Sequence, residues 1–151
     1  MKIYLAGASK EVDTLVPFLS ALRAAGHTIT HDWTTEVIYN RDKGGTDASL
    51  DSLDRLKYAR FDAEGVMAAD LLWECVPGTM PCPHCSQPIL SSSNGAWVEL
   101  GIAIGTYGLE HVISKRIVVS GDWPRSIFTE FADQKYATHR EALLALCAEK
   151  S

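Results

Sequence analysis

The stretch that decides the fold runs from Ile3 to His31 and opens with Ile3-Tyr4-Leu5-Ala6-Gly7-Ala8-Ser9. Its first four residues are typical of a short buried strand. Apolar residues at helical spacing follow, and they are Val12, Leu15, Val16, Leu19 and Leu22. Gly26 favours the end of that helix, and Thr28-Ile29-Thr30-His31 is the next strand candidate. This order predicts a parallel sheet, in which ligands bind outside the carboxyl ends of the strands.

The rest of the chain continues the alternation of strands and helices. In chain order we expect a polar loop over 35–48, a helix over about 50–60, a short helix or turn over 61–70, strands at 71–76 and 116–120, and helices around 126–132 and 139–149. This pattern predicts a single α/β doubly wound domain over residues 1–151, with helices on both faces of the sheet.

The composition is that of an ordinary globular protein, with 46% hydrophobic and 22% charged residues in a chain of 151. The formal net charge of −5 argues against a surface that grips a nucleic-acid polymer. The apolar run at the N-terminus is too short for a signal peptide, and no stretch approaches the ~18 apolar residues of a membrane span. We therefore expect a cytoplasmic protein that binds a small molecule and no membrane.

A second informative stretch is Ser91-Ser92-Ser93-Asn94-Gly95, which leads into a helical pattern that contains Glu99. It follows the strand predicted at 71–76, so it belongs to the ligand-binding edge. The unpaired N–H groups at the start of such a helix, with the serine hydroxyls, suit a phosphate. The alternative is an ordinary helix start, with Ser93 or Asn94 as the cap and Glu99 on the surface.

Three segments come in a fixed order along the chain: Ile3-Tyr4-Leu5-Ala6-Gly7, then Asp62-Ala63-Glu64-Gly65-Val66 with Ala69-Asp70, then Gly95-Ala96-Trp97-Val98-Glu99-Leu100-Gly101-Ile102-Ala103. Together they resemble the nucleoside 2-deoxyribosyltransferase family, which includes the related nucleoside 5′-monophosphate N-glycoside hydrolases. The resemblance covers the chain from Met1 to about Gly121. It implies a five-stranded parallel sheet of the Rossmann or flavodoxin type. It also implies a homodimer or higher oligomer, in which a neighbouring subunit completes the site.

The resemblance implies three catalytic residues. Glu99 matches the nucleophile that attacks C1′ of the sugar, Asp62 matches the acid that protonates the departing base, and Tyr4 matches the tyrosine that orients the glutamate. Cleavage of an N-glycosidic bond passes through an oxocarbenium-like sugar, so a carboxylate on one side and a proton donor at the base fit the reaction, and no cofactor is needed. Taken alone, Asp62 is also compatible with a helix cap and Tyr4 with an ordinary strand aromatic.

Ser93, six residues before Glu99, bears on the 5′ end of the substrate. The resemblance implies an acidic residue here in the transferases, which bind a free 5′-hydroxyl, and a serine in the hydrolases, which bind a 5′-phosphate. Ser93 therefore favours a nucleotide, although the loop after the first strand lacks the arginine and further glycines of the hydrolases. Further substrate-binding candidates at this edge are Gly7, Ser9, Lys10, His31, Trp33, Asn94 and Gly95. Trp33 is compatible with stacking on a base or with packing.

Cys82-Pro83-His84-Cys85 lies in a loop insertion at about residues 77–93. The spacing matches a redox motif that opens a helix, but Pro88 argues against a continuing helix. It also matches half of a structural zinc site, with Cys82 and Cys85 as two of four ligands and Cys75 or His84 as a third. The remaining interpretation is a surface loop with free thiols.

The sequence therefore predicts an enzyme that cleaves or transfers the N-glycosidic bond of a nucleoside or its 5′-monophosphate. One alternative is a module that binds the nucleotide in the same pocket without turning it over. The other is an interaction protein stapled by a metal ion at Cys82 and Cys85. The base, the sugar and the choice between hydrolysis and transfer stay open at this point.

Overall fold

One parallel sheet organises the chain in the computed structural model, which describes residues 1–46, 49–81, 85, 88–90, 94–107, 116–122 and 127–149. Its strands are β1 (Lys2–Ala6), β2 (Thr28–Ile29), β3 (Leu71–Val76), β6 (Arg116–Gly121) and β7 (Gln134–Tyr136). They pair in the order β2-β1-β3-β6-β7, and every neighbouring pair is parallel. The predicted five-stranded α/β fold is confirmed.

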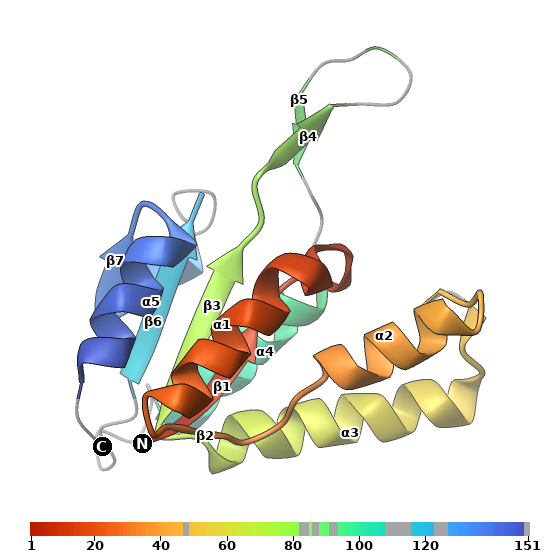
Figure 1. Ribbon diagram of the computed structural model, residues 1–151, viewed down its shortest axis with the longest axis horizontal. Coiled ribbons are helices and arrows are strands. Elements are labelled where there is room, and N and C mark those ends of the chain that lie inside the picture. The colour runs from red at the N-terminus through yellow and green to blue at the C-terminus, as the bar shows by residue number, and fades with distance from the viewer. Residues whose placement is uncertain are drawn as a thin grey trace.

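Helices cover both faces of this sheet (Figure 1). On one face α1 (Val12–Ala24) packs against α5 (His139–Ala148), and on the other α3 (Ser52–Ala68) packs against α4 (Asn94–Tyr107). All six residues of β3 are buried between these layers. Gly26 follows α1 with a φ of 91°, a backbone conformation that glycine adopts without strain, so the helix ends where the sequence predicts.

Successive side chains of a strand point to opposite faces of the sheet, so packing residues and predicted catalytic residues lie on different faces. On the α1 face, Trp73 stacks on Phe18 with ring centroids 5.7 Å apart, and its Nε1 donates a hydrogen bond to Ser120 Oγ at 2.8 Å. On the α4 face, the hydroxyl of Tyr4 reaches Glu99. The first face is therefore a packed core, whereas the second carries the predicted catalytic side chains.

The prediction of a polar loop over residues 35–48 is wrong over 35–42, because the chain forms helix α2 (Thr34–Asp42) there. Its β-branched residues lower the intrinsic helix propensity, and they are Thr34, Thr35, Val37 and Ile38. Packing against α1 outweighs this preference. At the start of α2, Thr35 Oγ1 donates a hydrogen bond to the carbonyl oxygen of Asp32 at 2.8 Å, which supports the first turn.

Three further elements differ from the prediction. The region 50–70 contains one continuous helix, α3, in which the N–H groups of Leu53 and Asp54 each donate a 2.8 Å hydrogen bond to the side chain of Asp51. The element near 126–132 is the short 3₁₀ helix η4 (Ile127–Phe131). The strand β7 was not predicted, because a three-residue, half-buried strand is too short to show an alternating pattern.

Between β3 and α4 the chain forms an antiparallel hairpin of β4 (Thr79–Pro81) and β5 (Pro88–Leu90), which extends away from the sheet beyond the end of β3 (Figure 1). It lies within the insertion predicted at about 77–93. Cys82 and His84 fall outside the described residues, and Cys85 is exposed. In the described part of the chain no group of three or more His, Cys, Asp and Glu side chains could hold a metal ion. The zinc interpretation stays a prediction.

None of the helices among the described residues is long and apolar enough to cross a lipid bilayer. The cytoplasmic location and the homo-oligomer stay predictions.

Candidate active site

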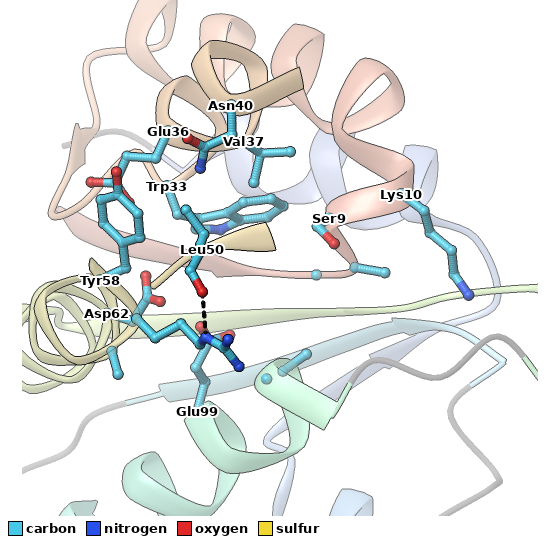
Figure 2. Close-up of a pocket in the computed structure, with 16 residues that line it drawn as sticks. Ser9, Lys10, Trp33, Glu36, Val37, Asn40, Leu50, Tyr58, Asp62 and Glu99 are labelled. Carbon is cyan, nitrogen blue, oxygen red and sulfur yellow. Dashed lines mark hydrogen bonds between the residues drawn. The ribbon is translucent and has the colours of Figure 1, made fainter. Parts of the chain in front are cut away.

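A cleft of about 620 Å³ opens at the carboxyl ends of β1 and β2, where the parallel sheet predicts a ligand site (Figure 2). Its walls come from the loop after β1, from α2, from α3 and from the first turns of α4. Seven of the residues singled out in the sequence as catalytic or substrate-binding line it, namely Gly7, Ser9, Lys10, Trp33, Asp62, Gly95 and Glu99. Ser93 and the side chain of Asn94 fall outside the described residues.

Three side chains meet beside this cleft through one hydroxyl group. The oxygen of the Tyr4 hydroxyl lies 2.7 Å from Glu99 Oε1 and 2.8 Å from Asp62 Oδ1. A phenol carries a single proton and donates it to only one carboxylate, so the second contact needs a proton from the other carboxyl group. The geometry therefore fits one proton shared by the two acids, which titrate as a coupled pair.

Burial controls the protonation of this group. It raises the pKa of Glu99 to about 8, with the hydrogen bond from Tyr4 acting against the rise and the charge of Asp62 adding to it. Burial also raises the pKa of Asp62, again against the hydrogen bond from Tyr4. The pKa of Tyr4 is raised by burial and by both neighbouring acids, so the phenol keeps its proton. Two carboxyl groups that titrate above their usual range in a cleft are suited to nucleophilic and acid–base roles.

Gly65 explains why α3 comes close enough to β1 for this contact. A Cβ atom at position 65 would lie 2.7 Å from the Cβ of His31 and 2.9 Å from two ring carbons of Tyr4. Asp62 precedes Gly65 by three residues, so both lie on the helix face that meets the sheet. The segment Asp62-Ala63-Glu64-Gly65-Val66 therefore combines an acid with the space that the tyrosine ring needs.

The first turns of α4 place Glu99 and an anion-binding element in the same wall. Ala96, Leu100 and Ala103 are buried at helical spacing and fix the helix against the sheet. Gly95 and Ala96 line the cleft at the end of the helix where backbone N–H groups lack intrahelical acceptors. Ser9 and Lys10 line the same cleft. This arrangement suits a phosphate or another anion.

Trp33 packs in the core, as one of its two interpretations predicts, and it also lines the cleft. Only 8% of it is exposed, and its Nε1 donates a hydrogen bond to the carbonyl oxygen of Leu5 at 2.7 Å. The indole ring is therefore held in one orientation and offers a rigid apolar wall to a ligand.

Four polar side chains that the sequence analysis did not single out also line the cleft, and they are Glu36, Asn40, Arg55 and Tyr58. The first two belong to α2, in the region predicted as a loop. The missed signal was the spacing of Trp33, Val37 and Asn40, which repeats as one face of a helix. Arg55 Nε donates a hydrogen bond to the carbonyl oxygen of Leu50 at 2.9 Å, drawn dashed in Figure 2.

His31, which the sequence predicts at this edge, lies between two acids. Its Nε2 is 3.5 Å from Asp62 Oδ1 and 3.7 Å from Glu36 Oε1. The ring of Phe61 packs against it with centroids 5.8 Å apart. His31 therefore links the Tyr4–Glu99–Asp62 group to the wall formed by α2.

Glu74 is a buried acid in the otherwise apolar strand Leu71–Val76, and no pattern in the sequence assigned it a role. It is 0% exposed, and neither carboxyl oxygen has a hydrogen-bond partner among the described residues. Burial, followed by the charge of Glu99, raises its pKa well above the ordinary value. Burial therefore favours the protonated form of Glu74 in the folded protein.

The sheet order and the position of the cleft define an α/β protein of the Rossmann-like class. A solved structure with this fold is that of the Clostridium botulinum CMP N-glycosidase, BcmB, which aligns over 97% of this chain and 98% of its own with a TM-score of 0.50. The two sequences are 15% identical, so the likeness establishes the shared fold. The predicted resemblance is confirmed at the level of the fold. No protein-family model and no curated protein matches the chain.

Proposed function

We propose that this protein is an enzyme that cleaves or transfers the N-glycosidic bond of a nucleotide. The observation that carries the proposal is the hydroxyl group of Tyr4 within hydrogen-bond distance of both Glu99 and Asp62 beside a ligand-sized cleft. The shared fold with a protein described as a CMP N-glycosidase supports the same class of reaction.

In the proposed reaction, Glu99 is the nucleophile and Asp62 is the acid. A carboxylate oxygen of Glu99 forms a bond to C1′ while the C1′–N bond breaks, and its electron pair goes to the base, which takes the proton of Asp62. Water, or an acceptor base, then attacks C1′, breaks the ester to Glu99 and returns a proton to Asp62. Tyr4 donates its hydrogen bond to the ionised Glu99 and holds it towards the sugar.

A 5′-monophosphate fits the cleft better than a free nucleoside. Lys10 and Arg55 bring positive charge, Ser9 brings a hydroxyl group, and the start of α4 brings backbone N–H groups. Among the described residues, α4 brings no acidic side chain to the cleft before Glu99. A phosphate therefore meets donors at the end of the cleft where a carboxylate would repel it.

The test is release of free base from a panel of ribo- and deoxynucleoside 5′-monophosphates and nucleosides. We expect release from the monophosphates, and loss of it on the order of 10³-fold or more in Glu99→Gln, because removing a covalent nucleophile removes the path itself. Acid-quenched wild type should carry a sugar-phosphate adduct on Glu99 by mass spectrometry. Glu64→Gln, an exposed position on α3, is the matched control and should keep full activity.

Undiminished release by Glu99→Gln would remove Glu99 from the nucleophile role. Tight binding of a nucleotide without any release would replace the enzyme by the alternative, a module that senses a nucleotide in the same cleft.

A further inference from the structure

We propose that Glu74 is a positioning residue for the nucleophile: its protonated carboxyl group holds a buried water molecule, which donates a hydrogen bond to the second carboxyl oxygen of Glu99. This inference rests on the proposed function and adds to it the part of the site that lies behind Glu99.

Glu74 lies on the face of the sheet that carries the predicted catalytic side chains. In the parallel pairing of β1 with β3, Ala6 lies opposite Glu74, and Tyr4 precedes Ala6 by two residues. Side chains two apart on a strand point to the same face, so Glu74 points with Tyr4 towards α4, which packs against β3. Gly7, the residue after Ala6, lines the cleft. Glu74 therefore lies behind the wall of the cleft that holds Glu99.

Three buried oxygen atoms on this face have no hydrogen-bond partner among the described residues. They are both carboxyl oxygens of Glu74 and Oε2 of Glu99, whose Oε1 receives the bond from Tyr4. Glu74 is 0% exposed, so bulk water does not satisfy its carboxyl group. Buried polar atoms in native proteins are nearly always paired, either within the protein or with an internal water. The two glutamates therefore need a shared partner.

A single internal water can bridge the two glutamates. The charge of Glu99 raises the pKa of Glu74, so the two carboxyl groups lie near enough to interact, yet no hydrogen bond joins them directly. A water accepts a hydrogen bond from the O–H of Glu74 and donates one to Glu99 Oε2. The neighbouring side chains at Ala6 on β1 and Ala96 on α4 are buried methyl groups, so neither extends far into the space between the acids.

The charges around the nucleophile favour this direction of donation. The titratable groups that face Glu99 come from three elements, and they are Tyr4 of β1, Asp62 of α3 and Glu74 of β3. When Glu99 ionises, its charge makes Glu74 hold its proton more firmly, so Glu74 stays a donor. Tyr4 then supports Oε1 and Glu74 supports Oε2. The ionised nucleophile is thereby fixed by one hydrogen bond on each oxygen.

The experiment compares Glu74→Leu, which removes the polar atoms, with Glu74→Gln, which keeps a neutral donor of the same length. We expect Glu74→Leu to lower kcat by about 10-fold with little change in KM, because ionised Glu99 loses a hydrogen bond. The acidic limb of its pH–rate profile should move up by about one unit. Glu74→Gln should restore the rate to within about 3-fold and the profile with it. Cys75→Ala, buried on the opposite face of β3, is the packing control and should leave the profile unshifted.

Two measurements need no activity. Carbon NMR of protein labelled at the glutamate carboxyl groups follows the titration of Glu99 in each variant, and nuclear Overhauser contacts from water report a long-lived water beside Glu74 in the wild type. Absence of that water would overturn the inference even where Glu74→Leu does not fold.

An unchanged titration of Glu99 in Glu74→Leu, or an equal shift in Cys75→Ala, would also overturn this role of Glu74 while leaving the proposed function standing. Absence of base release from every nucleotide would overturn the proposed function instead. The titration of Glu99 would then still decide whether Glu74 supports it.

Discussion

The Tyr4–Glu99–Asp62 group and the α2 wall, formed by Glu36 and Asn40, line one cleft but are built in opposite ways. In the first group Tyr4 and Glu99 are buried, Asp62 is half-buried, and the members hydrogen-bond to one another. The wall is half-exposed, and no hydrogen bond among the described residues occupies its two side chains. His31 connects them, because its Nε2 lies close to both Asp62 and Glu36.

The first group is preorganised by hydrogen bonds within the protein, whereas the donors and acceptors of the second are open to a bound ligand. Mutual hydrogen bonds fix the reacting groups and set their protonation, which is the preorganisation that catalysis needs. Open donors and acceptors gain partners only from a bound molecule, so they contribute to selection. Substitutions in the first group should therefore change the rate of reaction for all substrates, whereas substitutions in the wall should change the preference among them.

The largest effect after loss of the nucleophile is expected for Asp62→Asn. Without an acid the base leaves as an anion, so kcat/KM for a nucleotide should fall by about 10²–10⁴-fold. A substrate analogue with p-nitrophenolate as the leaving group needs no proton and should lose much less. Equal losses on both substrates would contradict the role of Asp62 as the acid and would leave it a part in binding alone.

Tyr4→Phe is expected to reduce kcat by about 10- to 100-fold, the value of a hydrogen bond to a charged group. The hydrogen bond that Tyr4 donates to ionised Glu99 lowers the pKa of Glu99, so its removal raises that pKa further. The acidic limb of the pH–rate profile, which requires ionised Glu99, should therefore move to higher pH. A lower rate with an unshifted profile would make Tyr4 a packing residue only.

Gly65→Ala tests whether the approach of α3 to the sheet builds the group. The added Cβ would overlap His31 and the ring of Tyr4, and we expect destabilisation of about 1–3 kcal/mol together with lower activity. Gly105→Ala, at an exposed position of α4, has open space around the new atom and should stabilise by about 0.5–1 kcal/mol. Denaturant unfolding of both variants measures the difference, and equal stabilities would show that the contact is not tight.

The smallest effect concerns Glu74, the buried acid with no hydrogen-bond partner among the described residues. Its pKa is raised in the folded state, so the unfolded chain releases this proton first and stability falls as the pH rises above about 4.5. Glu74→Gln removes this loss and should gain stability at pH 7 relative to pH 4, by on the order of 1 kcal/mol for each pKa unit of the shift. The exposed Glu64→Gln should show no such trend in thermal unfolding.

Several features of the site were predictable because they follow from local patterns. The apolar run around Tyr4, the order of strands and helices, and the ligand edge of a parallel sheet placed Tyr4, Glu99, Gly7 and Ser9 correctly at the cleft. Glu36 and Asn40 were not predicted at the cleft because residues 35–48 are polar and contain Gly44-Gly45, a composition typical of a loop. The strand β7 was not predicted, because its three residues are too few to show a periodic pattern.

By itself, the sequence determined the α/β class, the edge of the sheet that binds a ligand and the residue types available there. These follow from periodicities of two and 3.6 residues, which are local properties of the chain. Only the tertiary structure decided that Asp62 and Glu99 share the hydroxyl of Tyr4, that His31 lies close to Asp62 and Glu36, and that Glu74 is buried with no hydrogen-bond partner in the described part of the chain. Those facts depend on distances between residues far apart in the chain and on burial, and packing of the complete fold sets both.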